Sequence, residues 1–145
     1  MTNLEFFEVI KKNMKEYFVS KGYTKCRIYK GRRNAICFEK EVEFYTVYIE
    51  FHWQDYFKEA DVYDFCIGFT TTFLLYDTTK PRWLVWSFKT EEDLLELLKI
   101  IPQKIEEQDF FKKVDEASYK YFHRKDVLDT PHIASDNLGK NSVIM

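Results

Sequence analysis

Three side chains have the types and spacing nearest to a reactive group: Glu50, His52 and Asp64. Glu50 and His52 are two positions apart in a strand-like run, so we expect both to project from one face of the strand. A carboxylate beside an imidazole suits acid–base catalysis or metal binding. The spacing matches no common ligand pattern, and no second histidine or cysteine lies nearby in the sequence. We therefore favour a surface or interface role for these side chains.

The sequence contains no glycine-rich phosphate loop, no GxSxG and no HExxH. Asp61 and Asp64 flank the start of an expected strand, and nuclease centres use such carboxylates to hold magnesium. A magnesium-dependent nuclease site would also need a lysine or further acids at a defined spacing. We predict that the chain is not an enzyme and uses no metal or cofactor. An enzyme of unrecognised type, centred on Glu50, His52 and Asp64, is the third hypothesis.

Residues 54–61 form an expected loop that combines carboxylates with large aromatic rings. Rings supply contact area at low entropic cost, and charges steer an oppositely charged partner. This mixture suits a surface that binds a basic protein, although an acidic solvated loop with rings folded back on the core explains it equally well. The candidate partner-binding residues are Glu50, His52, Asp55, Tyr56, Glu59, Asp61 and Asp64.

A formal net charge of −2 conceals opposite charges in neighbouring segments. Residues 1–38 carry nine basic and three acidic side chains, a net charge of +6, whereas residues 39–64 carry two basic and eight acidic ones, a net charge of −6. Such asymmetry concerns partners rather than fold. The basic hairpin 21–33 gives the second hypothesis, a nucleic-acid-binding module whose affinity would fall steeply with salt. A solvated basic face is the simpler explanation of the same residues.

The elements that must position these side chains form one domain, 1–125. Two long strands, 43–53 and 62–76, surround the acidic loop, and period-two alternation gives each one apolar face and one more polar face. A hairpin at 23–39 precedes them. A fifth strand at 82–88 is apolar on both faces, so we expect it to be central or covered on both sides.

Helices are expected at both ends of the domain. Thr2 and Glu5 form a capping box before a helix at 3–20, whose core stripe is Leu4, Phe7, Ile10, Met14 and Phe18. Thr90 and Asp93 form a second box before a helix that is apolar over most of its circumference and that Pro102 should end or kink. Asp109 is expected to cap a third helix, 110–124. Residues 126–145 show no periodicity and form a tail.

Cys26, Cys37 and Cys66 are odd in number and form no CxxC pair, so we expect buried free thiols in a reducing compartment. The first residues do not resemble a signal peptide, and no apolar run approaches the length of a membrane span. A cytoplasmic protein without membrane contact is the expectation.

The layout resembles small bacterial immunity proteins of polymorphic-toxin and contact-dependent growth-inhibition systems. The resemblance rests on Phe18-x-x-x-Gly22-Tyr23-x-Lys25, on the long strand at 44–53 and on Phe110-Phe111-Lys112. It implies a cytosolic protein that binds and neutralises a cognate toxin domain, many of which are basic nucleases. The family shares no catalytic motif, so the resemblance assigns no functional residue.

We therefore predict an α+β protein with an N-terminal helix, an antiparallel sheet of about five strands, and two C-terminal helices on the same sheet face as the first. The favoured function is binding of a protein partner, in particular inhibition of a toxin through the acidic stretch 50–64.

Overall fold

A computed structural model describes residues 1–31, 34–54, 62–69 and 85–124. Within these ranges the chain runs α1 (Asn3–Ser20), β1 (Lys25–Tyr29), β2 (Ala35–Val42), β3 (Tyr45–Gln54), β4 (Tyr63–Phe69), β5 (Val85–Phe88), α3 (Glu91–Glu107) and α4 (Phe110–Phe122). The strands pair antiparallel in the order β1-β2-β3-β4-β5. The predicted α+β class and the sequence of elements are confirmed.

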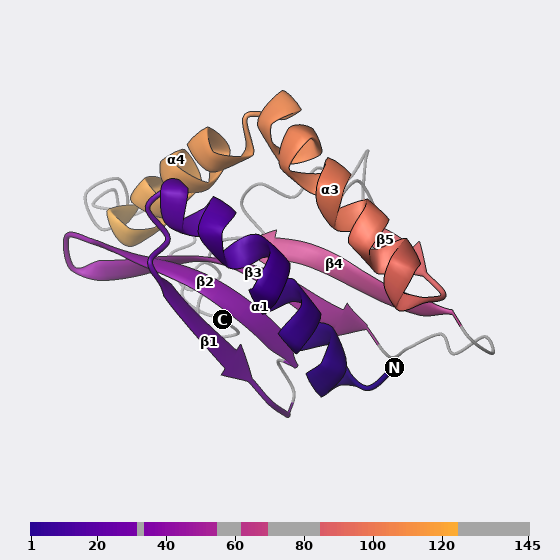
Figure 1. Ribbon diagram of the computed structural model, residues 1–145. Helices are drawn as coiled ribbons and strands as arrows, with labels where there is room; N and C mark the ends of the chain where they lie inside the picture. Colours follow the sequence, from indigo (N-terminus) through magenta and orange to yellow (C-terminus); the bar gives the residue numbers. More distant parts are fainter. Residues whose placement is uncertain (32–33, 55–61, 70–84, 125–145) are drawn as a thin grey trace, which may run out of the picture.

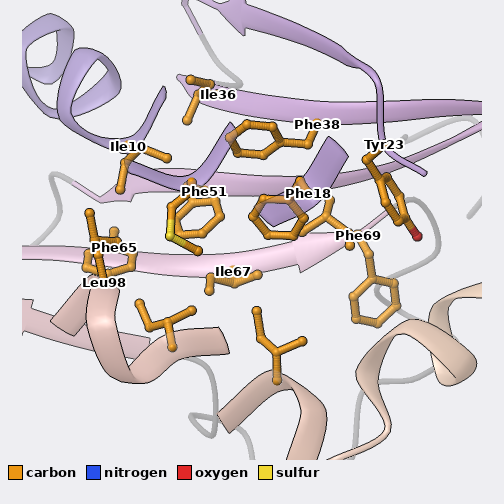
Figure 2. Close-up of a cluster of buried hydrophobic side chains, with 14 of the residues drawn as sticks. Ile10, Phe18, Tyr23, Ile36, Phe38, Phe51, Phe65, Ile67, Phe69 and Leu98 are labelled. Atoms are coloured by element: carbon orange, nitrogen blue, oxygen red, sulfur yellow. The ribbon is translucent and has the colours of Figure 1, made fainter. Parts of the chain in front are cut away.

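Helices α1, α3 and α4 lie on one side of the sheet (Figure 1). Helix α1 packs on β1, β2 and β3, α4 packs on β3, and α3 packs on β5 and α1. All three helices and the facing side chains of the sheet contribute to one buried cluster, part of which Figure 2 shows. Phe18 of α1 and Leu98 of α3 point into it from the helices, and Phe38, Phe51 and Phe65 point into it from the strands.

Strand β3 shows how the sequence pattern sets the two sheet faces. Tyr45, Val47, Ile49, Phe51 and Trp53 are buried, whereas the five residues that alternate with them are only half-buried. Because side chains alternate across a strand, the apolar set lies under the helices and the polar set lies on the opposite face. The predicted alternation of β3 is confirmed.

Both capping boxes are present. The Thr2 hydroxyl accepts from the Glu5 amide and the Glu5 carboxylate accepts from the Thr2 amide, and Thr90 and Asp93 make the same reciprocal pair. These bonds satisfy amides at the first turn that have no partner within the helix. Gly22, at φ 95, follows the end of α1 in the left-handed conformation that glycine adopts without strain.

Several predicted details of the helices are wrong. Leu4 is 47% exposed, and Phe6 takes the core position instead. Helix α3 buries one stripe, with Ile100 exposed. It does not end at Pro102 but continues to Glu107, because Ile101 and Ile105 on either side of the proline are anchored in the core. In the sheet, β5 lies at the edge of the described strands, so the expectation of a central strand is wrong, whereas the alternative of a strand covered on both sides stays a prediction. The residues expected at 70–76 and 82–84 are outside the described ranges.

Asp109 does not cap α4 through its side chain, contrary to prediction. Its backbone has φ 51 and ψ 40, and its amide donates to the Glu106 carbonyl at 3.1 Å. Asp109 therefore closes the end of α3 as a left-handed residue, a position that glycine occupies most often. This conformation directs its side chain away from the bond that an N-cap residue makes.

An Asp109→Gly variant should be about 0.5–1 kcal/mol more stable than the wild type, because glycine relieves the strain of the left-handed conformation. An Asp109→Ala variant retains that strain and should gain nothing. Urea denaturation of the three proteins measures the difference. A glycine variant no more stable than the alanine variant would contradict the assignment of Asp109 as the terminus of α3.

Candidate functional site

The sheet face opposite the helices, here called the outer face, collects the polar side chains of the strands. Cross-strand partners in the antiparallel register share a face, so the register identifies its members. They are Lys25, Arg27 and Tyr29 of β1, Ala35, Cys37, Glu39 and Glu41 of β2, Thr46, Tyr48, Glu50, His52 and Gln54 of β3, Asp64, Cys66 and Gly68 of β4, and Ser87 of β5. Helices α1, α3 and α4 lie on the opposite side of the sheet (Figure 1).

The three predicted site residues that the structure describes all lie on the outer face. Glu50 and His52 are successive outward positions of β3, as predicted, and Asp64 of β4 pairs with Gln54, one outward position further along. Each of the three side chains is half-buried. Asp55, Tyr56, Glu59 and Asp61 lie outside the described residues. The ends of the segment that contains them, Gln54 and Asp64, are cross-strand partners.

Glu50 and Asp64 each accept a hydrogen bond from a cross-strand neighbour. The Cys37 thiol donates to Glu50 Oε2 at 3.7 Å, which is long even for sulfur, and the Ser87 hydroxyl donates to Asp64 Oδ1 at 2.5 Å. The His52 Nδ1 atom is buried and has no hydrogen-bond partner, although Cys66 is directly opposite on β4. In the described part of the chain, no group of three or more His, Cys, Asp or Glu side chains is placed to hold a metal ion.

Cys26, Cys37 and Cys66 form no disulfide, and Cys37 is buried as predicted, whereas Cys26 and Cys66 are only half-buried. Cys26 belongs to the helix-covered face and the other two to the outer face. Burial, followed by the negative charge of Glu50, raises the pKa of the Cys66 thiol from 9.0 to about 11, and the hydrogen bond from Gln54 opposes this shift. Burial also raises the pKa of Cys26. Cys66 is therefore a weak nucleophile at neutral pH.

Cys66 should react slowly with iodoacetamide in the folded protein. Because its pKa is raised, the thiolate fraction at pH 8 falls from roughly one tenth to roughly one thousandth, which slows the reaction about 100-fold. The rate should then rise about tenfold per pH unit up to pH 11. Peptide mass spectrometry of timed reactions measures the rate at Cys66. Equal rates in folded and urea-denatured protein at pH 8 would contradict this environment.

The outer face is acidic because strand alternation brings four carboxylates of the segment 39–64 to it: Glu39, Glu41, Glu50 and Asp64. The two basic side chains that the register places there both belong to β1. Arg27 Nε lies 3.2 Å from Glu39 Oε1, and Lys25 Nζ lies 3.4 Å from Glu41 Oε1. Glu39 and Glu41 were counted in the acidic segment but not proposed as site residues. Their strand has four apolar residues followed by three charged ones, AICFEKEV, so no alternation in the sequence marks which of these charges face outward, and only the strand register shows it.

The same ion pairs bear on the basic hairpin. Lys25 and Arg27 pair with acids of β2, and Lys21 pairs with Glu106 of α3 at 2.5 Å. Acidic neighbours therefore compensate three of the positive charges on which a nucleic-acid interface would depend. Lys30 is exposed, and residues 32 and 33 are outside the described ranges. The nucleic-acid hypothesis remains a prediction with less support than the sequence alone gave it.

No family model, no curated protein and no solved structure matches this chain. The resemblance to immunity proteins therefore remains a prediction that rests on the sequence pattern. Among the described residues, none of the helices combines the length and the apolar character that a membrane span requires.

Proposed function

We propose that this protein is a binding module whose acidic outer face takes a basic protein partner, and in its most specific form an immunity protein that neutralises a cognate toxin domain. One observation carries the proposal. The acidic residues of segment 39–64 are distributed along two hairpins of the sequence, yet the strand register gathers Glu39, Glu41, Glu50 and Asp64 on one sheet face.

Carboxylates on one face produce a negative potential that steers a basic partner during diffusional encounter. Two of the four, Glu39 and Glu41, also form ion pairs with basic side chains of β1. Tyr48 and His52, half-buried beside them on β3, supply amphipathic contact surface of the kind that is enriched at interfaces.

The face is rigid enough to serve as a recognition surface. Its strands are fixed from the other side by the aromatic core, in which Phe51 of β3 and Phe65 of β4 are fully buried with ring centroids 6.0 Å apart. A preorganised surface loses little conformational entropy on binding, which favours affinity. Asp55, Tyr56, Glu59 and Asp61, which the sequence also predicts to bind the partner, lie outside the described residues.

Co-expression with the product of the reading frame directly upstream of this gene tests the proposal. If that product is toxic alone, we expect the present chain to restore growth and to elute with it as one complex in size-exclusion chromatography. A toxic neighbour that is neither bound nor neutralised would overturn the immunity assignment. An unrelated small acidic protein expressed at the same level is the control for non-specific charge effects.

A further inference from the structure

An open pocket of about 470 Å³ lies at the end of the outer face, where the turn between β2 and β3 meets the end of α4. This volume falls in the range of protein ligand sites, roughly 300–1,000 Å³. The side chains that matter for its chemistry are Arg27, Tyr29, Glu39, Glu41, Tyr48 and Tyr121. Phe44, at the tip of the turn, also lines the pocket and is 68% exposed.

The rim of the pocket is held by contacts between the turn and α4. His123 Nε2 lies 3.0 Å from Glu43 Oε2, and the rings of Tyr45 and Phe122 stack with centroids 4.3 Å apart. Glu43 has a φ of 52, a strained conformation for a residue other than glycine. Val42 pairs with Tyr45, so Glu43 and Phe44 are the central residues of a two-residue hairpin turn, and such turns require a positive φ at a central position. The turn presents the Phe44 ring to solvent beside the pocket.

The charges that line the pocket favour a cation. Glu39 is 4% exposed and is bonded by Arg27 Nε at 3.2 Å and by the Tyr29 hydroxyl at 2.9 Å, so the charge of Arg27 is compensated within the wall. Glu41 is exposed and pairs with Lys25 at 3.4 Å, with both side chains more than half exposed. Exposed pairs of this kind are weak and exchange readily. The Thr46 hydroxyl also lies 3.2 Å from both carboxylate oxygens of Glu41, so an incoming positive charge can replace Lys25 while Thr46 keeps the carboxylate at the pocket.

The aromatic rings narrow the choice of cation. Flat guanidinium groups stack on aromatic faces and bind carboxylates through two parallel N–H groups, whereas an ammonium group is a more strongly hydrated point charge. The pocket already displays this chemistry at its rim, where the guanidinium of Arg124 lies 4.3 Å from the centroid of the Tyr121 ring. Tyr48 and Phe44 offer further aromatic surface in the same cavity.

We propose that this pocket binds an arginine side chain of the protein partner, with Glu41 as the counter-charge and Phe44 as the aromatic cover. The inference rests on the proposed function, since it supposes a basic protein partner. It adds that one arginine of the partner is the main contact and that this arginine binds at the β2–β3 end of the outer face. An arginine buried in such a pocket is the kind of contact that dominates the binding energy of an interface.

NMR titration with the peptide acetyl-Gly-Arg-Gly-amide tests the pocket without the partner, followed through the backbone amides of Thr46 and Tyr48. The citrulline peptide, which has the same shape without the charge, should bind at least about tenfold more weakly, and the lysine peptide should fall between the two. Equal binding of the arginine and citrulline peptides, or perturbation confined to other parts of the chain, would overturn the proposal.

Two exposed positions provide the variants. Glu41→Gln and Phe44→Ala should each weaken arginine-peptide binding about five- to tenfold, whereas Glu92→Gln, which changes another exposed carboxylate on α3, should leave it unchanged. If Glu41→Gln and Glu92→Gln weaken binding equally, the peptide is held by general charge attraction rather than by the pocket, and the proposal is overturned. A different result would show that the proposed function is wrong while the pocket is real. In that case the protein still binds the arginine peptide but does not protect cells against the toxic neighbour.

Discussion

A Phe18→Ala variant is expected to lose about 3–5 kcal/mol of unfolding free energy, the usual cost of truncating a core phenylalanine. Phe18 is fully buried, and its ring centroid lies 4.5 Å from that of Phe38 and 5.9 Å from that of Phe51. Because Phe18 belongs to α1 and its two neighbours belong to β2 and β3, the change opens a cavity where the helix meets the sheet (Figure 2). Such a loss is a large share of the total stability of a small domain, about 5–15 kcal/mol.

Urea denaturation followed by circular dichroism measures the loss, and Phe44→Ala is the matched control. Phe44 is the same residue type, but it is 68% exposed, so its removal should change the free energy of unfolding by no more than about 0.5 kcal/mol. Similar losses in the two variants would show that the core is not where the structure places it.

The second large effect concerns the outer face. Replacing Glu50 and Asp64 together by lysine should lower the association rate constant for the basic partner about 10- to 100-fold at low salt, because like charges then face each other during encounter. The difference from the wild type should shrink as salt is added, since screening removes long-range attraction. Stopped-flow mixing with the purified partner measures the rate constant at several salt concentrations.

The matched control is the double variant Glu91→Lys, Glu92→Lys. Both residues are exposed in the first turn of α3, on the helical side of the sheet, so this variant changes the net charge by the same amount away from the proposed interface. Its association rate should fall by no more than about twofold. Because Glu50 and Asp64 are half-buried, thermal unfolding of each variant must first establish that the fold is intact. Equal rate losses in the two double variants would assign the effect to net charge rather than to the outer face.

Local sequence signals predicted the elements of the fold well. The capping boxes at Thr2 and Thr90 located two helix starts, because their hydrogen bonds join residues within one turn. The alternation in β3 located both sheet faces, because successive side chains along a strand point to opposite sides. The pairing of Glu50 with Cys37 and Gly68 depends on strand register, and no local pattern in the sequence specifies it.

Details that depend on tertiary packing were predicted poorly. Leu4 and Phe6 both fit an amphipathic helix, and only the position of α1 on the sheet decides that Phe6 is the buried one. Pro102 should interrupt a helix by itself, yet its buried neighbours hold α3 together. The pocket beside Phe44 joins β1, β2 and β3 to α4, whose residues are about 80 positions apart in the chain, so composition alone could not reveal it.

Mapping the bound partner on this protein by NMR tests the central claim most directly. Backbone amide signals are recorded for the free protein and for its complex with the toxic neighbour's product. The account predicts that the largest shifts fall on Thr46, Tyr48, Glu50, His52 and Asp64 of the outer face, while Leu4, Val19 and Ile100, exposed on the helical side, remain unchanged. Shifts centred on the helices, with the outer face unchanged, would contradict it.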